Sequence, residues 1–411
     1  MQLRGTFMKI GKKIFFILCV FFIGQAVFSA AFTGFSGIKG DYFSDSSAES
    51  FDPQLEISAF FSGQLDISPQ FLIRTELSLK TNDIIETKLF EETESYFCVD
   101  ELSLTYIKPF LGITQYVSLF LGNFEPIGSD VFLQRQFGIL PITSLLTESW
   151  LGLRGSTVYP FYGVGGSYII HMNNKPYATG LSIYGNKNNE KEINQLNVDF
   201  RFATVHQFLT VDLSAGFGAP LNQKNGTEDV ILLIDELYLH AGIDFLLGNN
   251  FSQALFIQAG FENFPVRTKN SQIYSNEIYL LFEPRLYTKN FRAHLTFFSL
   301  PAQTVQKLSF IEENHTLGLN LSIFTDKLYV KNRDFTFGFH TTLSFADSDF
   351  FDLQRILELQ EKEYCLKVSP FLTVPVMGGE LKSMLQVKLN DFTGDRWQDH
   401  FKFSLGYKSQ I

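Results

Sequence analysis

Strict alternation of apolar and polar residues, repeated along nearly the whole chain, is the feature that most constrains its fold. The stretch LNVDFRFATVHQFLTVDLSAGFG (196–218) twice sets a row of apolar residues against Asp, Arg, Ser and Gly. The pattern returns in FLIRTELSLK (71–80), ELYLHAGIDF (236–245) and FTFGFHTTLSF (335–345). Successive side chains of a β-strand point to opposite faces, so each stretch predicts a strand with one apolar and one polar face.

About eighteen such strands are predicted, and the lengths of their connections alternate. The predicted strands cover 33–42, 54–66, 71–80, 98–107, 114–122, 158–171, 177–185, 194–204, 208–217, 232–246, 252–263, 274–286, 291–299, 315–323, 335–345, 362–373, 381–390 and 400–408. Connections after even-numbered strands are mostly short, such as ISPQ and VHQ, whereas those after odd-numbered strands are long and polar, such as GNKNNEKE and DFTGDRWQDH. Short turns on one rim and long loops on the other are typical of transmembrane β-barrels.

This pattern predicts an all-β fold: a transmembrane antiparallel up-and-down β-barrel of about 16–18 strands, formed by residues 32–411 as one domain. A soluble β-sandwich also alternates, but it would need a second layer to cover so many apolar residues, which include 46 Phe. In a barrel the apolar face meets lipid and the polar face lines a water-filled lumen. Inward Gly and Ser are then tolerated, because such a lumen has no core to fill.

The N-terminus has a different composition. MKIGKKIFFILCVFFIGQAVFSAAF carries Lys9, Lys12 and Lys13 before an apolar run and ends in small residues. This order predicts a secretory signal peptide over residues 1–31, with Phe32 first in the mature chain. Removing the four basic residues of this region moves the formal net charge from −10 to about −14. A chain this acidic is not expected to bind nucleic acid.

The whole mature chain resembles bacterial outer-membrane β-barrels in the size range of porins and substrate channels. FKFSLGYKSQI (401–411) resembles their assembly signal, an alternating aromatic final strand, although four residues follow Tyr407 and the chain ends in Ile411. YVSLFLGNFEPIGSDVFLQRQFG (116–138) also resembles porins, with a strand followed by a loop containing Gly-Ser-Asp. The resemblance implies the bacterial outer membrane as location, with its lipid and the barrel-assembly machinery as partners. A homo-oligomer is compatible with it.

The longest connection, residues 123–157, is the first candidate for a functional element. It carries Glu125, Asp130, Arg135 and Glu148 among many apolar residues, too many for a loop wholly in water. In porins a long loop folds inward and narrows the pore, and the resemblance implies the same constriction here. The alternative is that WLGLRG (150–155) forms a further strand, which would change the strand count.

Charges on the polar faces of the strands are the second candidate. They are mostly acidic in the middle of the chain and mostly basic after it, which predicts an acidic wall and a basic wall across the lumen. The alternative is a scatter of charges over a wet surface, where single pairs contribute little. The predicted pore-lining residues are Asp199, Arg201, Asp212, Glu236, Asp244, Glu262, Glu277, Glu283, Arg285, Arg292, Lys367, Lys382, Lys388 and Lys402.

Inward aromatic residues form a third set, namely Phe120, Tyr184, Tyr238, Phe256, Tyr279, Phe298 and Phe371. They could guide a ligand along the wall, but such residues more often belong to a rim girdle or fill the space beneath a loop. The seven His are dispersed without metal-ligand spacing, and no GxSxG setting occurs, so neither catalysis, a cofactor nor a metal is predicted.

The sequence therefore predicts an outer-membrane porin-like channel for passive diffusion of small polar solutes. One alternative is a transporter of hydrophobic compounds, similar to the long-chain fatty-acid channels, although those carry an N-terminal plug. The other is a surface-exposed adhesin or structural barrel with a blocked lumen.

Overall fold

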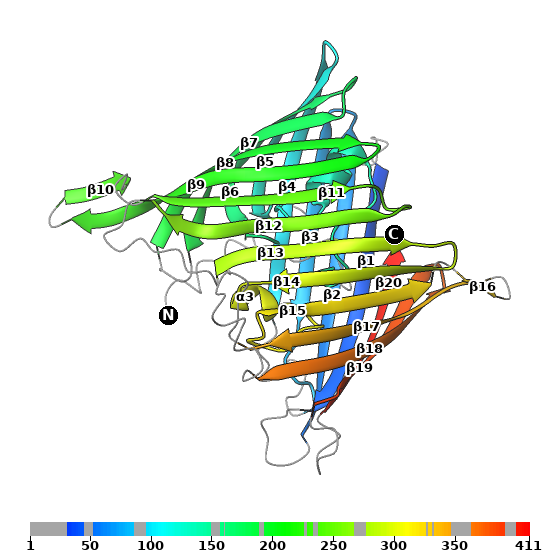
Figure 1. The fold of residues 1–411 in the computed structure, drawn as a ribbon. Coiled ribbons are helices and arrows are strands. Elements are labelled where there is room, and N and C mark those ends of the chain that lie inside the picture. The colour runs from blue at the N-terminus through cyan, green and yellow to red at the C-terminus, as the bar shows by residue number, and fades with distance from the viewer. Residues whose placement is uncertain are drawn as a thin grey trace.

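The computed structural model is a closed barrel of eighteen antiparallel strands, and Figure 1 shows them wrapping around one interior. It describes residues 31–44, 52–85, 96–148, 157–159, 161–188, 193–225, 228–232, 237–266, 277–325, 328–330, 333–346, 363–390 and 400–411. The predicted signal peptide, apart from Ala31, lies outside the described residues, as do Glu236 and the WLGLRG stretch.

Each strand of the barrel pairs with the next one along the chain, and β20 pairs with β1 to close the ring. The barrel strands are β1 (Ala31–Ser44), β2 (Pro53–Ser68), β3 (Phe71–Lys80), β4 (Tyr96–Phe110), β5 (Ile113–Asn123), β6 (Tyr162–Met172), β7 (Tyr177–Asn188), β8 (Ile193–His206), β9 (Leu209–Asn225), β11 (Tyr238–Leu247), β12 (Ala254–Pro265), β13 (Ile278–Tyr287), β14 (Phe291–Ser299), β15 (Leu317–Thr325), β17 (Arg333–Phe345), β18 (Tyr364–Val376), β19 (Gly379–Lys388) and β20 (Phe401–Gln410).

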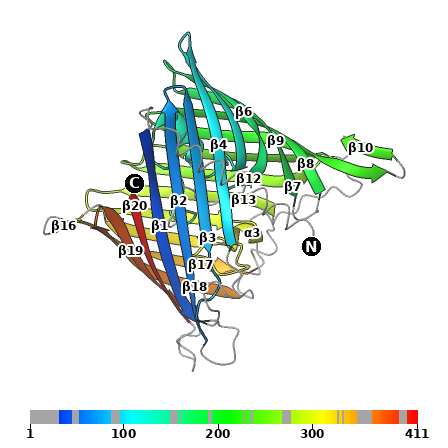
Figure 2. The same cartoon turned by 180° about the vertical axis from the view of Figure 1, so that it is seen from behind.

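Two short strands extend hairpins beyond the ring. β10 (Glu228–Leu232) pairs with the end of β9, and β16 (Leu328–Val330) pairs with the start of β17. In Figures 1 and 2 the strands of the near wall run across those of the far wall. This crossing is expected, because a sheet can close into a barrel only when its strands tilt against the barrel axis.

All eighteen predicted strands are present, with shifts at their ends. The largest shift is at the end of the strand predicted at 208–217, since β9 continues to Asn225. The strands predicted at 232–246 and 158–171 begin late, since β11 begins at Tyr238 and β6 at Tyr162. Val158 and Tyr159 belong instead to the preceding loop and are buried. β5 pairs directly with β6, so no further strand of the ring lies between them.

The alternation of faces is confirmed. On β8 Asp199 and Arg201 are buried toward the interior, whereas Phe200, the residue between them, is 48% exposed on the outside. Phe217, Phe282 and Phe403 are other exposed aromatic residues of the outer face. An outer surface of this kind is stable against lipid tails and not against water.

The interior differs from the prediction, since it is not a lumen without a core. Buried apolar side chains from strands and loops form a continuous cluster inside the barrel, including Ile127, Leu133, Phe256 and Phe298. Two interstrand segments fold inward to build it, and they contain the short helices α2 (Val131–Phe137) and α3 (Ala302–Val305). None of the helices in the described part of the chain is long and apolar enough to span a membrane.

Candidate functional site

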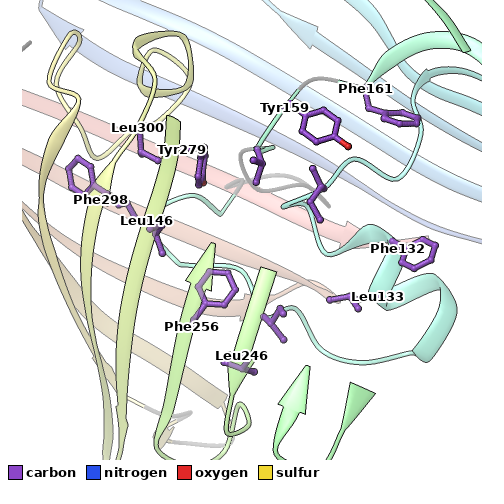
Figure 3. Packing of buried hydrophobic residues seen from close by; sticks show 14 of the residues in the cluster. Phe132, Leu133, Leu146, Tyr159, Phe161, Leu246, Phe256, Tyr279, Phe298 and Leu300 are labelled. Carbon is purple, nitrogen blue, oxygen red and sulfur yellow. The ribbon is translucent and has the colours of Figure 1, made fainter. Parts of the chain in front are cut away.

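Between β5 and β6 the structure describes residues 124–148, 157–159 and 161, which lie against the inner face of the barrel wall. We call these residues the β5–β6 loop. Its apolar side chains Ile127, Phe132, Leu133 and Leu146 are at most 1% exposed. Figure 3 shows Leu133 and Leu146 beside Leu246, Phe256 and Tyr279 of β11, β12 and β13. The inward aromatic residues of these strands therefore fill the space beneath a loop.

Two inward-facing glycines of the wall allow this loop to approach it closely. A Cβ atom at Gly242 of β11 would lie only 3.0 Å from Ile127, and one at Gly260 of β12 would collide with Val158. Both glycines face the lumen side of their strands, where any side chain would push the loop away from the wall. They are needed for close approach and are not merely tolerated in an empty lumen, as the sequence analysis assumed.

Polar side chains of the wall hold the backbone of the same loop. Arg201 of β8 donates to the carbonyl oxygen of Glu125 at 3.1 Å, and Arg285 of β13 donates to that of Ile142 at 2.7 Å. Ser144 of the loop donates to the Glu283 carboxylate. Because buried backbone carbonyls need partners, these contacts fix the loop to β8 and β13 as specifically as its apolar residues do.

Four residues of the predicted acidic wall, Asp199, Asp212, Asp244 and Glu283, are buried beneath this loop, each with a polar partner. Asp212 accepts two hydrogen bonds from Arg201, at 2.6 and 2.5 Å, and Glu283 accepts one from Arg285 at 2.7 Å. Asp199 contacts His240, and Asp244 accepts a hydrogen bond from Gln258 at 2.8 Å. Asp212, Asp244 and Glu283 are 0% exposed. These carboxylates are therefore parts of a polar core.

Arg135 of helix α2 joins the loop to the opposite strands β3 and β4. Its guanidinium lies 3.0 Å from Glu101, 3.5 Å from Glu125 and 3.7 Å from Glu76. Glu76 and Glu101 are buried and were not among the predicted site residues. Their inward positions in alternating strands were the available signal, but their partner lies too far along the chain for the sequence to identify it.

A second segment, residues 300–316 between β14 and β15, also folds inward; we call it the β14–β15 loop. Val305, Phe310 and Ile311 are buried, and the ring of Phe310 lies 4.2 Å from that of His340 on β17. Gln386 of β19 donates to the Ser309 carbonyl oxygen at 2.8 Å. The segment is therefore not the long polar connection expected after an odd-numbered strand, and its apolar residues carry the same signal as those of the β5–β6 loop.

Basic residues that were predicted to line the pore lie along the other side of the barrel. Lys367 and Lys388 contact Glu312 of the β14–β15 loop at 2.7 and 3.5 Å, and Lys402 lies 3.7 Å from Asp41 of β1. Their side chains keep 16%, 28% and 30% of their surface exposed. These lysines therefore meet solvent, unlike the acids beneath the β5–β6 loop.

The remaining predicted residues occupy separate places. Arg292 stacks on Tyr287 at 4.7 Å, and Lys382 stands 5.5 Å from the Phe371 ring. Glu262 accepts a hydrogen bond from its neighbour Asn263, whereas Glu277 is exposed just before β13, and Glu148 is exposed in the β5–β6 loop. The thirteen predicted wall residues that the structure describes thus do not gather around one opening.

The largest described cavities in the interior beside the two loops include the following three. Two of them, of about 450 and 640 Å³, lie toward the short turns, and Gln134 of helix α2 lines both. The third, of about 400 Å³, lies toward the long loops and is lined by Ser44, Glu312 and Lys402. β20 contributes to all three, through Lys408, Gln410 and Lys402 respectively.

The pKa values of two loop carboxyl groups are shifted in opposite directions. Burial raises the pKa of Asp130 to about 6, against the hydrogen bonds that it accepts from Thr143. Burial would also raise the pKa of Glu312, but Lys367 and Lys388 outweigh it and lower that pKa to about 2. Near neutral pH the Glu312 contacts are therefore ion pairs. Within the described ranges, no group of three His, Cys, Asp or Glu residues is placed to hold a metal ion.

Comparison with known proteins finds no matching protein-family model and no matching curated protein sequence. Among solved structures, two mutants of the Rhodopseudomonas blastica porin match 93% of this chain and 100% of theirs, both with TM-score 0.44, at 8% and 10% identity. Wzi, a carbohydrate-binding β-barrel of the Escherichia coli outer membrane involved in capsule assembly, matches at TM-score 0.46 and 11% identity, over 92% of this chain and 84% of its own. The closed ring of strands and their apolar outer face, taken by themselves, are those of a bacterial outer-membrane β-barrel.

Proposed function

We propose that the protein is a narrow channel for passive diffusion of small polar solutes across the outer membrane. The observation that carries this proposal is the distribution of the remaining space. Cavities lie toward both rims of the barrel, and β20 borders each of them. Between these cavities β20 faces the interior with the small residues Ser404 and Gly406, which are themselves buried.

The β5–β6 loop has the position of a constriction in this proposal. It covers β8 to β13 and leaves β20 and β1 on the opposite side, so the passage would run between helix α2 and those two strands. Lumenal surfaces that are charged and polar suit hydrated solutes, because a polar wall replaces part of a solute's hydration shell.

The interior core favours one second candidate, a closed structural or adhesive barrel. The cluster of buried apolar residues reaches from Phe120 of β5 to Met384 of β19, so it involves most of the circumference. In that case the external loops would carry the function and no solute would pass.

Single-channel recording separates the two candidates. Residues 32–411 are refolded, inserted into planar bilayers and recorded, with heat-denatured protein from the same preparation as the control. We expect small, steady conductance steps, smaller than those of an open barrel with this number of strands. Protein that inserts and resists protease but conducts no ions would contradict the channel and support the closed barrel. Uptake of a fatty acid without ionic conductance would instead support a hydrophobic-compound transporter.

A further inference from the structure

Six lysines occupy the interior face of four neighbouring strands, β18, β19, β20 and β1. We call them the lysine row; they are Lys39, Lys367, Lys382, Lys388, Lys402 and Lys408. On β20, Lys402 and Lys408 share their face with Ser404, which donates a hydrogen bond to Asp41 inside the barrel. Phe403 and Leu405 point to the opposite side and are 44% and 43% exposed. The row therefore faces the lumen and not the lipid.

Strand register spreads these lysines over the height of the barrel. Lys39 of β1 and Lys382 of β19 both pair with Gly406 of β20, one from each side, so they stand at the same level. Lys408 follows two residues closer to the short-turn rim, and Lys402 lies four residues closer to the long-loop rim. Lys367 and Lys388 pair with each other across β18 and β19. Cations thus recur from one rim to the other.

Acidic residues are fewer on the same face. Among the described lumen-facing residues of these four strands, the acids are Asp41 and Glu380. The β14–β15 loop adds Glu312 and Glu313, and the β5–β6 loop adds Glu148. Asp41 lies 2.8 Å from Lys39 and 3.7 Å from Lys402, so one carboxylate serves two ammonium groups. On the four strands themselves six lysines face two acids, an excess of positive charge, although the whole chain has a formal net charge of −10.

Three of the lysines are held by aromatic rings. Lys408 stands 4.1 Å from the ring centre of Phe35, Lys402 4.9 Å from Phe43, and Lys382 5.5 Å from Phe371. A ring attracts an ammonium group through its quadrupole but carries no net charge. It fixes the position of the lysine without neutralising it, which a carboxylate partner would do.

The cavities show the same sign of charge. Arg285, Arg292 and Lys408 face Asp130 and Glu148 in the cavity of about 450 Å³. Lys367, Lys388 and Lys402 face Glu312 and Glu313 in that of about 400 Å³. The cavity of about 640 Å³ is lined by Arg74, Arg135 and Glu76. Counting side chains alone, each cavity is lined by one more cation than anions, while Asp212 and Asp244 line none of the three.

We infer that the channel selects small anions, and that the lysine row on β18, β19, β20 and β1 is the element that selects them. This inference rests on the proposed function. A wall of fixed positive charge in a narrow passage raises the local concentration of anions and repels cations. The substrate class is therefore small solutes with a carboxylate, phosphate or halide charge.

Reversal potentials in a KCl gradient test this inference on residues 32–411 in planar bilayers. The unmodified protein is expected to pass chloride in preference to potassium. Lys382→Glu and Lys402→Glu should each lower the ratio of chloride to potassium permeability roughly threefold or more, because each reverses a charge within a few ångströms of the passage. Lys382→Arg should keep the ratio.

Lys175→Glu is the matched control, because this exposed lysine lies in the short turn between β6 and β7, away from the lysine row. It carries the same change of charge and should leave the permeability ratio unmoved. Heat-modifiable migration on gels checks that every variant is folded. Channels that conduct but prefer potassium, or that respond equally to Lys175→Glu and Lys402→Glu, would overturn the inference while the proposed channel stands. Inserted protein that never conducts would overturn both.

Discussion

Two arcs of the same barrel use the same sequence pattern in opposite ways. On β8 to β13 the polar faces lie under the β5–β6 loop, and Asp212, Asp244 and Glu283 have no exposed surface. On β18 to β20 and β1 the polar faces border cavities, and Lys388 and Lys402 keep 28% and 30% of their side-chain surface exposed. Alternation therefore fixes which residues face inward, whereas the presence or absence of a covering loop decides whether those residues form a buried core or a solvent-exposed wall.

The difference has an energetic reason. A charge that leaves water must find a partner and hydrogen bonds, or the cost of desolvation is not offset. The arc of β8 to β13, which we call the covered arc, meets this condition with Arg201 and Arg285. Each of these arginines binds both a carboxylate of the wall and a carbonyl oxygen of the loop. On β18 to β20 and β1, which we call the open arc, Asp41 and Glu312 are each shared between two lysines, and solvent and aromatic rings also stabilise these ammonium groups.

The largest effect is expected from breaking a pair in the covered arc. Arg201→Met leaves the Asp212 carboxylate buried without its partner and should lower the free energy of unfolding by about 3–5 kcal/mol. Urea unfolding of the protein in lipid vesicles, followed by circular dichroism, measures this loss. Lys402→Met on the open arc is the control and should cost at most about 1 kcal/mol. Equal losses would show that the two arcs do not differ as described.

A second substitution tests the apolar packing between the β5–β6 loop and the barrel wall. Leu133 of helix α2 is 0% exposed, and Leu133→Ala should cost about 2–5 kcal/mol by leaving a cavity under the β5–β6 loop. Leu140→Ala is the matched control, since Leu140 is 59% exposed in the same loop. In the same vesicles, Leu133→Ala should also raise the single-channel conductance by loosening the loop. A stability loss without any change in conductance would argue that the loop does not border the passage.

The smallest effects concern pH, and they should have opposite signs in the two loops. The raised pKa of Asp130 means that the folded protein holds a proton more tightly than the unfolded chain, so stability falls as pH rises from about 4 to about 6. The lowered pKa of Glu312 means that its contribution is present above the unfolded value of 4.5 and is lost as pH falls toward about 2.

Urea midpoints measured across these two ranges compare the variants. Asp130→Asn should flatten the decline between pH 4 and 6. Glu312→Gln should flatten the loss below pH 4.5, by about 1 kcal/mol or less, because solvent screens its pairs with the lysines. Each variant serves as the control of the other. The same slope change in both would mean that neither carboxyl group is titrating as its surroundings indicate.

Much of the architecture could be predicted, because it depends on local rules. The eighteen strands, their inward faces and the long segment after β5 follow from period-two alternation and from the lengths of the connections. Strand ends were less certain: Val158 and Tyr159 continue the apolar pattern, but they pack inside the barrel as loop residues. An alternating stretch does not reveal whether it pairs with a neighbour or turns inward.

The candidate site could be predicted only in part, because its partners are distant in sequence. Arg135 meets Glu76 across 59 residues, and Glu283 meets Ser144 across 139. The β14–β15 loop was missed, although Val305, Phe310 and Ile311 are as apolar as the residues that drew attention to the β5–β6 loop. Segregation of acids and bases was visible in the sequence, but the pairing of the acids was not.

By itself the sequence determined a barrel, since an apolar outer face on every strand can be stable only when the sheet closes in lipid. It also determined which side chains face inward, because a strand has just two faces. Only the tertiary structure decided what the interior is. Two loops fold back over particular strands, bury the acids of one arc as a paired core and leave the lysines of the other beside open space. That choice depends on contacts between segments far apart in the chain, which no local period encodes.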